Sequence, residues 1–440
     1  MAEQVTTNAT LEKIKEKVAV LKKQGGFGIL KGVIDGKKGI REIDPKDEAR
    51  RAAFLSDEDK AEKRKKLKAE LAILKELVTA DDPVSTCEEQ NKKVATVLNE
   101  NLANIFNEVK DLEKSYRTID LFFRNSGEES IRNLHIINMP TEEFASESNT
   151  ELRSVLQQHF KENYDRFSLE DNYSLFVIPG YLGDNLDYWS KQAAKFRMTL
   201  VTDFKDEREF ESIQDSVEER KLAGSDKHKA NTVVTCNHIV IRKKNEGVES
   251  EDLVIPASAL LAGKMWAGNG IQPPAGKKYG KLDGALGVRM PLLRSQADAI
   301  DKMGLVPIIF EKEWGAPTAM SDTTLACESG DPDLRALGVV RAKDWIAKVL
   351  LDYFNGLTFQ VFDGNLRKEI KGELNKFFKK ISGYGGLIED YSIERIEADP
   401  DDPQTVKLAV NVKPYFATKH YVIDFSGTQN RFKAEDNEDE

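Results

Sequence analysis

The 440-residue sequence contains little cysteine, with only Cys87, Cys236 and Cys327, which stand far apart. Because secreted scaffolds carry even numbers of cysteines at regular spacings, this pattern excludes a disulfide framework and favours a reducing compartment. The N-terminus lacks the apolar core of a signal peptide, and no stretch approaches the roughly 20 apolar residues of a membrane span. We therefore expect a cytoplasmic protein that does not enter a membrane.

Basic charge is also in deficit, since 65 Lys and Arg face 75 Asp and Glu, giving a net charge of −10 and a pI near 5.4. Nucleic-acid binding requires a basic face, so we expect no nucleic-acid partner. The 40% hydrophobic and 8% aromatic content is typical of a folded chain with two or three domains.

Catalytic motifs are missing as well. The sequence has no GxxxxGK[ST] phosphate loop, and residues 25–32 lack the preceding strand of a dinucleotide loop. Cys236 and His238 offer two metal ligands without a second pair at zinc-site spacing, and Cys327 has no nucleophile elbow around it. We therefore expect no catalytic residue, cofactor or metal, and a structural protein is favoured over an enzyme.

The first 125 residues have helical periodicity. Thr10 caps a short helix, which ends at Gly25 and whose apolar positions are Leu11, Ile14, Val18 and Leu21. Two long helices follow, one from near Ser56 and one from near Ser85 to about Arg117. Their apolar positions include Leu67, Leu71, Leu74, Leu77 and Val78 in the first, and Val94, Val97, Leu98, Leu102, Ile105, Phe106, Val109 and Leu112 in the second. Such a stripe must be buried on something, either a partner helix or the chain's own domain.

From residue 121 the pattern changes to alternating strands and helices, which predicts an α/β (mixed α+β) core with a mixed sheet. The expected strands are 134–138, 175–178, 198–201, 232–242 and 305–310, and the expected helices are 188–196, 344–354 and 366–380. The polar stretches 214–230 and 243–252 are expected to be surface loops.

The C-terminal region predicts two further strands, with apolar side chains at Val406, Leu408, Val410, Val412, Tyr421, Ile423 and Phe425. Two strands alone are marginal, so they add to the chain's own sheet or pair with strands of another chain. The last eight residues, KAEDNEDE, predict a solvated acidic tail.

One basic helix stands out in this acidic chain, at 366–380. Its cations are Arg367, Lys368, Lys371, Lys376, Lys379 and Lys380. A docking surface for an acidic partner and an ordinary solvated helix face are both compatible with this pattern.

Three stretches resemble the large sheath subunit of type VI secretion systems, the TssC or VipB type. In the first, 106–121, a long helix ends with an aromatic–arginine pair, although Tyr116 stands where the family usually has tryptophan. The second, 253–318, contains IPAS, AGKMW and PPAG runs similar to a core pattern shared with phage tail sheaths. It ends in WGAPT, where Pro317 departs from the family's arginine.

Arg341 falls where that family has an arginine before a helix, and the third stretch, 354–425, includes an apolar strand near 361–362, a helix, GGL at 385–387 and the final strands. The shorter chain resembles a divergent branch of the kind found in Bacteroidetes. Each match is weak alone, but their order extends over about 320 residues.

The resemblance implies several partners. A small sheath subunit (TssB/VipA type) would pack on the long helices through Leu71, Leu74, Leu98, Leu102 and Ile105. Neighbouring copies would exchange the C-terminal strands, and the basic helix would contact an inner tube (Hcp type). A baseplate, and a hexameric ATPase unfoldase that grips the first helix after contraction, complete the expected set.

The implied domain division is 1–45, an N-terminal helix and linker arm; 46–125, the long helices; 126–345, the core with a charged surface insertion at about 205–252; 346–428, the C-terminal domain; and 429–440, the acidic tail. Two alternatives stay open: the sheath of a phage tail or extracellular injection particle, and an α/β enzyme or ligand-binding protein with a helical adaptor.

Overall fold

The computed structural model describes residues 61–127, 131, 133–168, 172–268, 272–402 and 404–419, and every structural statement below refers to these residues. The chain divides into two compact units, 1–108 and 109–440, whose boundary falls within the long helix α5 (Pro83–Ser126). The first unit contains α4 (Ala61–Thr79) and the amino-terminal part of α5. The two predicted long helices are thus confirmed, and α5 runs about nine residues beyond its predicted end.

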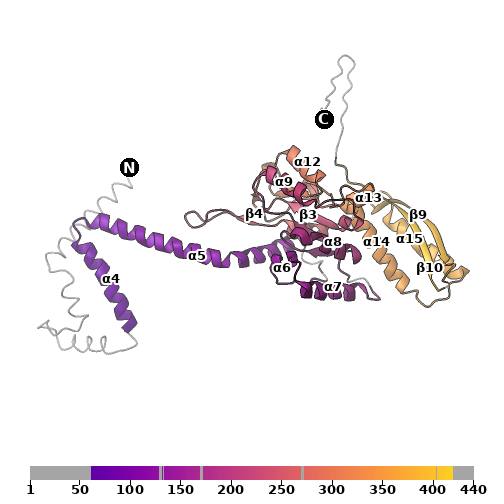
Figure 1. Ribbon diagram of the computed structural model, residues 1–440, viewed down its shortest axis with the longest axis horizontal. Helices are drawn as coiled ribbons and strands as arrows, with labels where there is room; N and C mark the ends of the chain where they lie inside the picture. Colours follow the sequence, from indigo (N-terminus) through magenta and orange to yellow (C-terminus); the bar gives the residue numbers. More distant parts are fainter. Residues whose placement is uncertain are drawn as a thin grey trace, which may run out of the picture. The chain divides into compact units, whose positions relative to one another are not determined.

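The second unit contains the remaining elements (Figure 1). Its helices are α6 (Thr141–Ala145), α7 (Thr150–Tyr164), α8 (Leu186–Lys195), α9 (Phe210–Arg220), α10 (Ser258–Ala267), α11 (Gly276–Tyr279), α12 (Arg294–Lys302), α13 (Pro332–Arg335), α14 (Leu337–Asn355) and α15 (Gly364–Ile381). Short 3₁₀ turns are η3 (Gly183–Asn185), η4 (Lys227–Asn231) and η5 (Lys312–Trp314). Its strands are β1 (Leu175–Val177), β2 (Thr199–Asp203), β3 (Thr232–Cys236), β4 (Ile239–Arg242), β5 (Leu253–Ile255), β6 (Gly287–Val288), β7 (Val306–Phe310), β8 (Pro317–Ala319), β9 (Ile388–Ala398) and β10 (Val406–Pro414).

The central sheet has the order β1-β2-β3-β7-β8, in which the first four strands are parallel and β8 is antiparallel. This confirms the predicted mixed sheet. A second sheet of order β5-β4-β6 is antiparallel, and β9 and β10 form a separate two-stranded sheet.

Both faces of the central sheet are covered, which explains why its strands are continuous apolar runs. Leu200 and Val234 point into one core, which α7, α8, α9 and α12 complete. Val201 and Val233 point into a second core, formed with α10, β4 and β5. Neighbouring residues of a strand face opposite sides, so one strand supplies both cores.

A third core belongs to the C-terminal part, where α14 and α15 pack on β9 and β10 (Figure 1, orange to yellow). Asp363 caps α15 by accepting hydrogen bonds from the backbone of Asn365 and Leu366. The helix buries Ile370, Leu374 and Phe378, which recur at the four-residue spacing of one helix face.

Four expectations need correction. Residues 134–138 and 361–362 form no strand in the described structure, where no strand lies beside either of them. Ile136 and Val361 are consequently exposed. The stretch 214–230, expected as loop, contains most of α9 and η4. The buried Ile213, in the first turn of α9, anchors that helix in the core. The range 205–252, expected as a charged surface insertion, includes β3 at the centre of the sheet, because its apolar run supplies both cores.

The end of α5 lies against α10 at a glycine. A Cβ atom built on Gly263 would lie 2.6 Å from the carbonyl oxygen of Phe122 and 2.9 Å from the Cβ of Asn125. Two helix backbones approach this closely only when the contact residue has no side chain. The neighbouring Asn125 side chain donates to the carbonyls of Leu121 and Asp283 and accepts from the backbone N–H of Asp283.

We therefore expect Gly263→Ala to destabilise the second unit by about 1–3 kcal/mol, because the clash is with backbone that cannot move aside. Thermal unfolding and chymotrypsin sensitivity would measure the effect. Gly372→Ala in α15 is the matched control, since no atom lies within 4 Å of its added methyl group. An unfolding temperature of the Gly263 variant equal to that of the control would contradict the close approach.

Candidate assembly surfaces

The longest exposed feature is an apolar stripe on α5, defined here as Leu98, Leu102, Ile105, Val109, Leu112, Tyr116 and Ile119. Leu98 is 55% exposed, Ile105 56% and Leu112 73%, although all three are large apolar side chains. Leu102 is half-buried. The described residues therefore do not cover this stripe.

The spacing within the α5 stripe is 4, 3, 4, 3, 4 and 3 residues, a strict heptad alternation from Leu98 to Ile119. An average of 3.5 residues per step is the pattern of a left-handed coiled-coil seam rather than of a helix on a globular core. The residues around the stripe are mostly polar or charged, so the stripe is narrow. This geometry fits one or two partner helices.

The apolar residues of α4 differ in exposure. Leu71 is half-buried, while Ile73 is 54% and Leu74 42% exposed. The structure thus confirms helix at all five residues proposed to contact a small sheath partner, but it does not test the contact.

The carboxyl-terminal part of α5 is tied to the loop 243–252 by Arg242 at the end of β4. Its guanidinium donates to both carboxylate oxygens of Glu113, at 3.1 and 3.2 Å, and to both of Glu249, at 2.6 and 2.9 Å. Hydrogen bonds from Arg242 lower the pKa of Glu249 to about 2, so this carboxylate stays charged at neutral pH. Sequence reasoning could not find this bridge, because Glu113 and Arg242 stand 129 residues apart.

The basic helix α15 exposes every cation proposed from the sequence. Its buried side chains occupy one face, and helical geometry places Lys368, Lys376, Lys379 and Lys380 on the opposite face. Lys376 pairs with Glu373 at 2.7 Å, and none of the other five cations has an ion pair within the described chain. The helix therefore presents surplus positive charge to solvent.

The C-terminal strand β10 pairs with β9, a strand that the sequence did not predict. The sequence missed β9 because its inward residues Ile388, Tyr391, Ile393 and Ile396 are spaced 3, 2 and 3 apart. Register shifts opposite Ala409/Val410 and Lys413/Pro414 leave Glu394 and Glu389 as extra residues on β9, which breaks the period of two. Leu408, Val410 and Val412 pack on the third core, while Val406 is 37% exposed.

Two sets of proposed residues lie outside the described part of the chain. These are the strand residues Tyr421, Ile423 and Phe425, and the helix residues Leu11, Ile14, Val18 and Leu21.

The chemical groups in the core are structural. Burial raises the pKa of Cys236 to about 12, so its thiol is a poor nucleophile, and burial also raises the pKa of Cys327. The described residues include no group of three or more His, Cys, Asp or Glu that could hold a metal ion. None of the described helices is long and apolar enough to cross a membrane.

Asp203, at the end of β2, is the most connected buried acid. It is 2% exposed and accepts hydrogen bonds from the backbone N–H groups of Gly180 and Ser258, each at 2.9 Å, and from the hydroxyls of Thr235 and Ser258. These four hydrogen bonds connect the carboxyl-terminal ends of β1, β2 and β3 to the start of α10. No imidazole or amine donates to this carboxylate. An acid directly after an apolar strand run was the sequence signal for this clamp.

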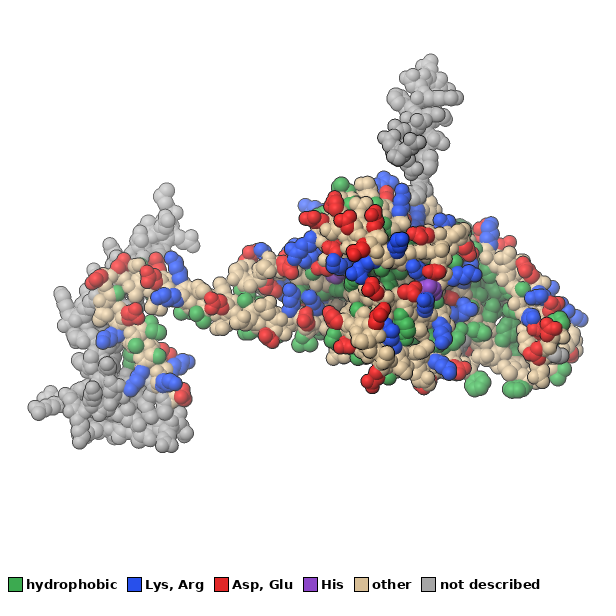
Figure 2. Space-filling model, in the orientation of Figure 1, with side chains coloured by type: hydrophobic (Ala, Val, Ile, Leu, Met, Phe, Trp, Pro, Cys, Tyr) green, Lys and Arg blue, Asp and Glu red, His purple; other side chains and the backbone are tan. Residues whose placement is uncertain are grey.

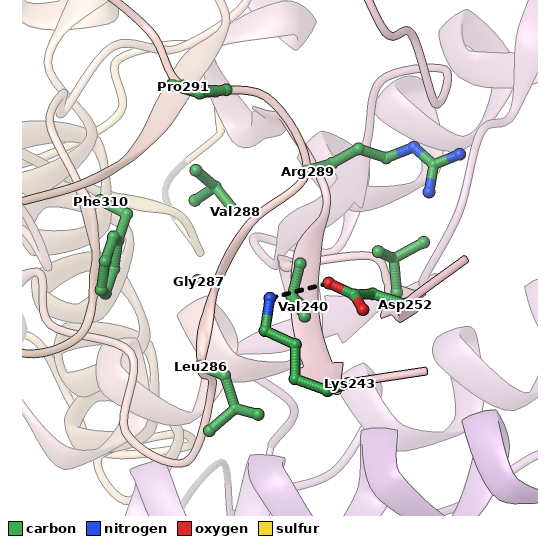
Figure 3. A pocket seen from close by; sticks show the side chains of 10 residues that line it. Val240, Lys243, Asp252, Leu286, Gly287, Val288, Arg289, Pro291 and Phe310 are labelled. Carbon is green, nitrogen blue, oxygen red and sulfur yellow. Dashed lines mark hydrogen bonds and ion pairs between the residues drawn. The ribbon is translucent and has the colours of Figure 1, made fainter. Parts of the chain in front are cut away.

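A hollow of about 330 Å³ lies along β4 and β6 (Figure 3). Lys243 and Asp252 point toward one another across it and pair at 2.8 Å, and Leu286, Val288 and Phe310 form its apolar walls. No Ser, Thr, Cys or His lines it.

The remaining residues singled out by resemblance position the core. Gly315 has φ of 76°, a left-handed conformation that glycine adopts without strain, and Pro317 begins β8. Arg341 in α14 donates to the carbonyl of Met265 at the end of α10 at 2.8 Å, and burial lowers its pKa to about 10. This arginine therefore connects α14 to α10.

Several solved structures resemble this chain at low sequence identity. A chain of the anti-feeding prophage baseplate, six-fold symmetrised, is 15% identical, with 70% of this chain and 79% of that chain covered and a TM-score of 0.50. A chain of the contracted anti-feeding prophage helical sheath is 15% identical, covering 71% and 82%, with a TM-score of 0.48. A sheath tail protein from Desulfitobacterium hafniense is 12% identical, covering 60% of each chain, with a TM-score of 0.39. No single curated protein matches the sequence.

Family models that match along the chain define a structural protein of the contractile-sheath class. Three family models match along the chain: "Type VI secretion system TssC/VipB, central domain" at 104–326, "TssC/VipB-like, C-terminal domain" at 336–439 and "TssC/VipB-like, N-terminal region" at 14–103. Since the central model alone covers more than half of the sequence, the chain belongs to the TssC/VipB family of type VI secretion sheath proteins. Proteins of this family are structural and not enzymes.

Proposed function

We propose that this chain is the large subunit of a cytoplasmic contractile sheath, which assembles with a small sheath protein of the TssB/VipA type around an inner tube and contracts to propel that tube for effector secretion. The observation that carries the proposal is the exposed heptad stripe of α5. A stripe of this length is costly to leave in water, since burying each large apolar side chain stabilises by about 1.5–3 kcal/mol. A partner helix supplies that burial.

Replacing Leu98, Ile105 and Leu112 together by Glu should abolish co-purification with the small sheath protein, weakening binding by at least about 100-fold because charges enter an apolar seam. The matched control is Thr96→Glu, Asn104→Glu and Asn107→Glu, which adds the same charge to the opposite, exposed face of α5. Pull-down of the co-expressed pair measures both. Equal loss in the control, or normal binding by the stripe variant, would refute the partner assignment.

The basic face of α15 supports contact with an inner tube of the Hcp type, provided that the tube presents acidic groups. Changing Lys376 and Lys379 to Glu should release the tube while sheath length and appearance stay normal, because both side chains are exposed and the pair of Lys376 with Glu373 lies within α15 itself. The control is Lys277→Glu with Lys278→Glu in α11, where the lysines are equally exposed. Co-purification of the tube at the wild-type level would exclude α15 as the attachment helix.

The hairpin β9–β10 supports strand exchange between neighbouring copies. Each of its two strands has only one partner among the described residues, so each leaves an edge open to another chain. Neighbours tethered by such ladders can slide while their other contacts change, as two packings of one assembly require.

If residues 420–425 form an exchanged strand, a chain ending at residue 419 should bind the small sheath protein but form no tubes. A chain ending at residue 428 keeps this segment and should form tubes of normal length. Negative-stain microscopy distinguishes the two. Tubes from the shorter chain would rule out exchange through these residues.

The exposed charges of the second unit suit repeated, reversible contacts. Figure 2 shows acidic and basic side chains interspersed over one face, without a large area of one sign. An exposed ion pair contributes only about 0–1 kcal/mol, but many identical copies add to a large difference between two packings. The similarity to a baseplate chain supports the baseplate as a further partner.

Recycling by a hexameric ATPase unfoldase is proposed from the resemblance alone, through the segment that carries Leu11, Ile14, Val18 and Leu21. Removal of residues 1–24 should then leave contracted sheaths that the unfoldase no longer disassembles, as light scattering would report. Unchanged disassembly would end this proposal. Membership of a Bacteroidetes-like branch also stays a prediction.

A sheath of a phage tail or extracellular particle is the second candidate, favoured by the fold shared with the anti-feeding prophage. Tube formation by this chain without any small partner would favour that candidate over the first.

A further inference from the structure

A basic cleft of about 550 Å³ lies in the second unit, away from the surfaces proposed above. It is bounded by α8, η4 and α14, at the edge where the parallel strands β2 and β3 begin. Its lining residues are Tyr164, Lys191, Ala194, Lys195, Arg197, Lys227, His228, Asn231 and Asp344. Four Lys or Arg side chains thus face one carboxylate, in a chain whose net charge is −10.

The acids at this cleft are already engaged. Asp344 accepts from Arg197 at 3.0 Å and from Asn231 at 2.6 Å. Asp187, which lies beside the cleft, pairs with Lys191 and with His228, each at 2.6 Å. Asp226, the residue before η4, is exposed and acts on Lys191 at longer range.

Two lysines at the cleft have no ion pair within the described chain. Within the described chain, neither Lys195 nor Lys227 has a carboxylate within ion-pair distance, and both are exposed at the cleft. Cations outnumber the carboxylates in and beside this shallow cleft, so its net positive charge attracts anionic groups.

The backbone beside the cleft has a left-handed conformation at Arg197. Arg197 follows α8 with φ of 49°, a left-handed conformation that costs a residue with a side chain roughly 1–2 kcal/mol and that glycine would adopt freely. The strained residue places its guanidinium on Asp344 at the cleft wall. The conformation belongs to the turn that ends α8, in which the N–H of Met198 donates to the carbonyl of Ala193 at 2.9 Å.

The sequence contains one segment of matching charge. Residues 435–440 read EDNEDE, five acids in six positions. Just before it, Lys419 pairs with Asp301 at 3.2 Å and with Asp322 at 3.1 Å. Leu337, the first residue of α14, donates its N–H to the carbonyl of Asp322, and Asp344 of the cleft lies seven residues, about 10 Å, further along that helix.

The distance is easily spanned. Fifteen residues separate Lys419 from Glu435, and an extended chain of that length reaches about 50 Å. Because the segment is tethered near the cleft, its effective concentration there is of millimolar order, enough for a weak, charge-driven contact to form.

We propose that the acidic segment 435–440 binds the basic cleft of its own chain, with its carboxylates on Lys195 and Lys227. The proposal does not depend on the sheath partners assigned above.

The test uses a fluorescent peptide of sequence KAEDNEDE and two proteins, the full chain and a chain that lacks residues 433–440. At low salt the shortened chain should bind the peptide at least about tenfold more tightly than the full chain, because the tethered segment competes. Binding should weaken steeply as salt is raised.

Lys195→Glu with Lys227→Glu, placed in the shortened chain, should lower peptide affinity by about tenfold or more. Lys195→Gln with Lys227→Gln, a milder change, should give an intermediate loss and guards against misfolding. The control is Lys277→Glu with Lys278→Glu, which should bind like the unaltered shortened chain. Equal peptide binding by the full and shortened chains, or by the cleft and control variants, would overturn the proposal. Competition that grows with the concentration of the full chain would assign the segment to a neighbouring copy, and would overturn binding within one chain.

Discussion

The architecture depends on the close approach of α5 to α10 at Gly263. Because Gly263 has no side chain, the carbonyl of Phe122 can lie where a Cβ would otherwise stand. Leu121 is then buried at 3% exposure, and Asn125 exchanges hydrogen bonds with the backbone of Asp283. This contact fixes the carboxyl-terminal part of α5, and with it one end of the exposed stripe, on the core of the second unit.

The core and the assembly surfaces are separate parts of the second unit. The central sheet is buried on both faces and its strand ends are clamped by Asp203, so it has little freedom to change. The exposed cations of α15, the open edges of β9 and β10 and the basic cleft lie outside it. The sheath function proposed above would need this separation, because a subunit would have to keep its fold while its neighbours change position.

Sequence periodicity predicted the elements whose burial follows a regular pattern. The helices α4, α5, α8, α14 and α15 and the strands β1, β2, β7 and β10 fall where the apolar spacing indicated. It failed for β9, whose two extra glutamates shift the inward face, and for 134–138, an apolar run without a neighbouring strand. In both places the deciding contact is with residues far along the chain or with a local irregularity that composition does not record.

The sequence by itself determined the mixed α/β class of the fold, because helix spacing and strand runs are local properties of the chain, and three stretches of it resemble the sheath family. It also determined the α5 stripe, because a heptad repeat is a spacing of apolar residues along one segment of the sequence. Only the tertiary structure decided that α5 is held at Gly263, that Arg242 bridges Glu113 and Glu249, and that cations from α8 and η4 share one cleft. Each of these joins residues distant in sequence, and their proximity arises from chain folding rather than from any pattern along it.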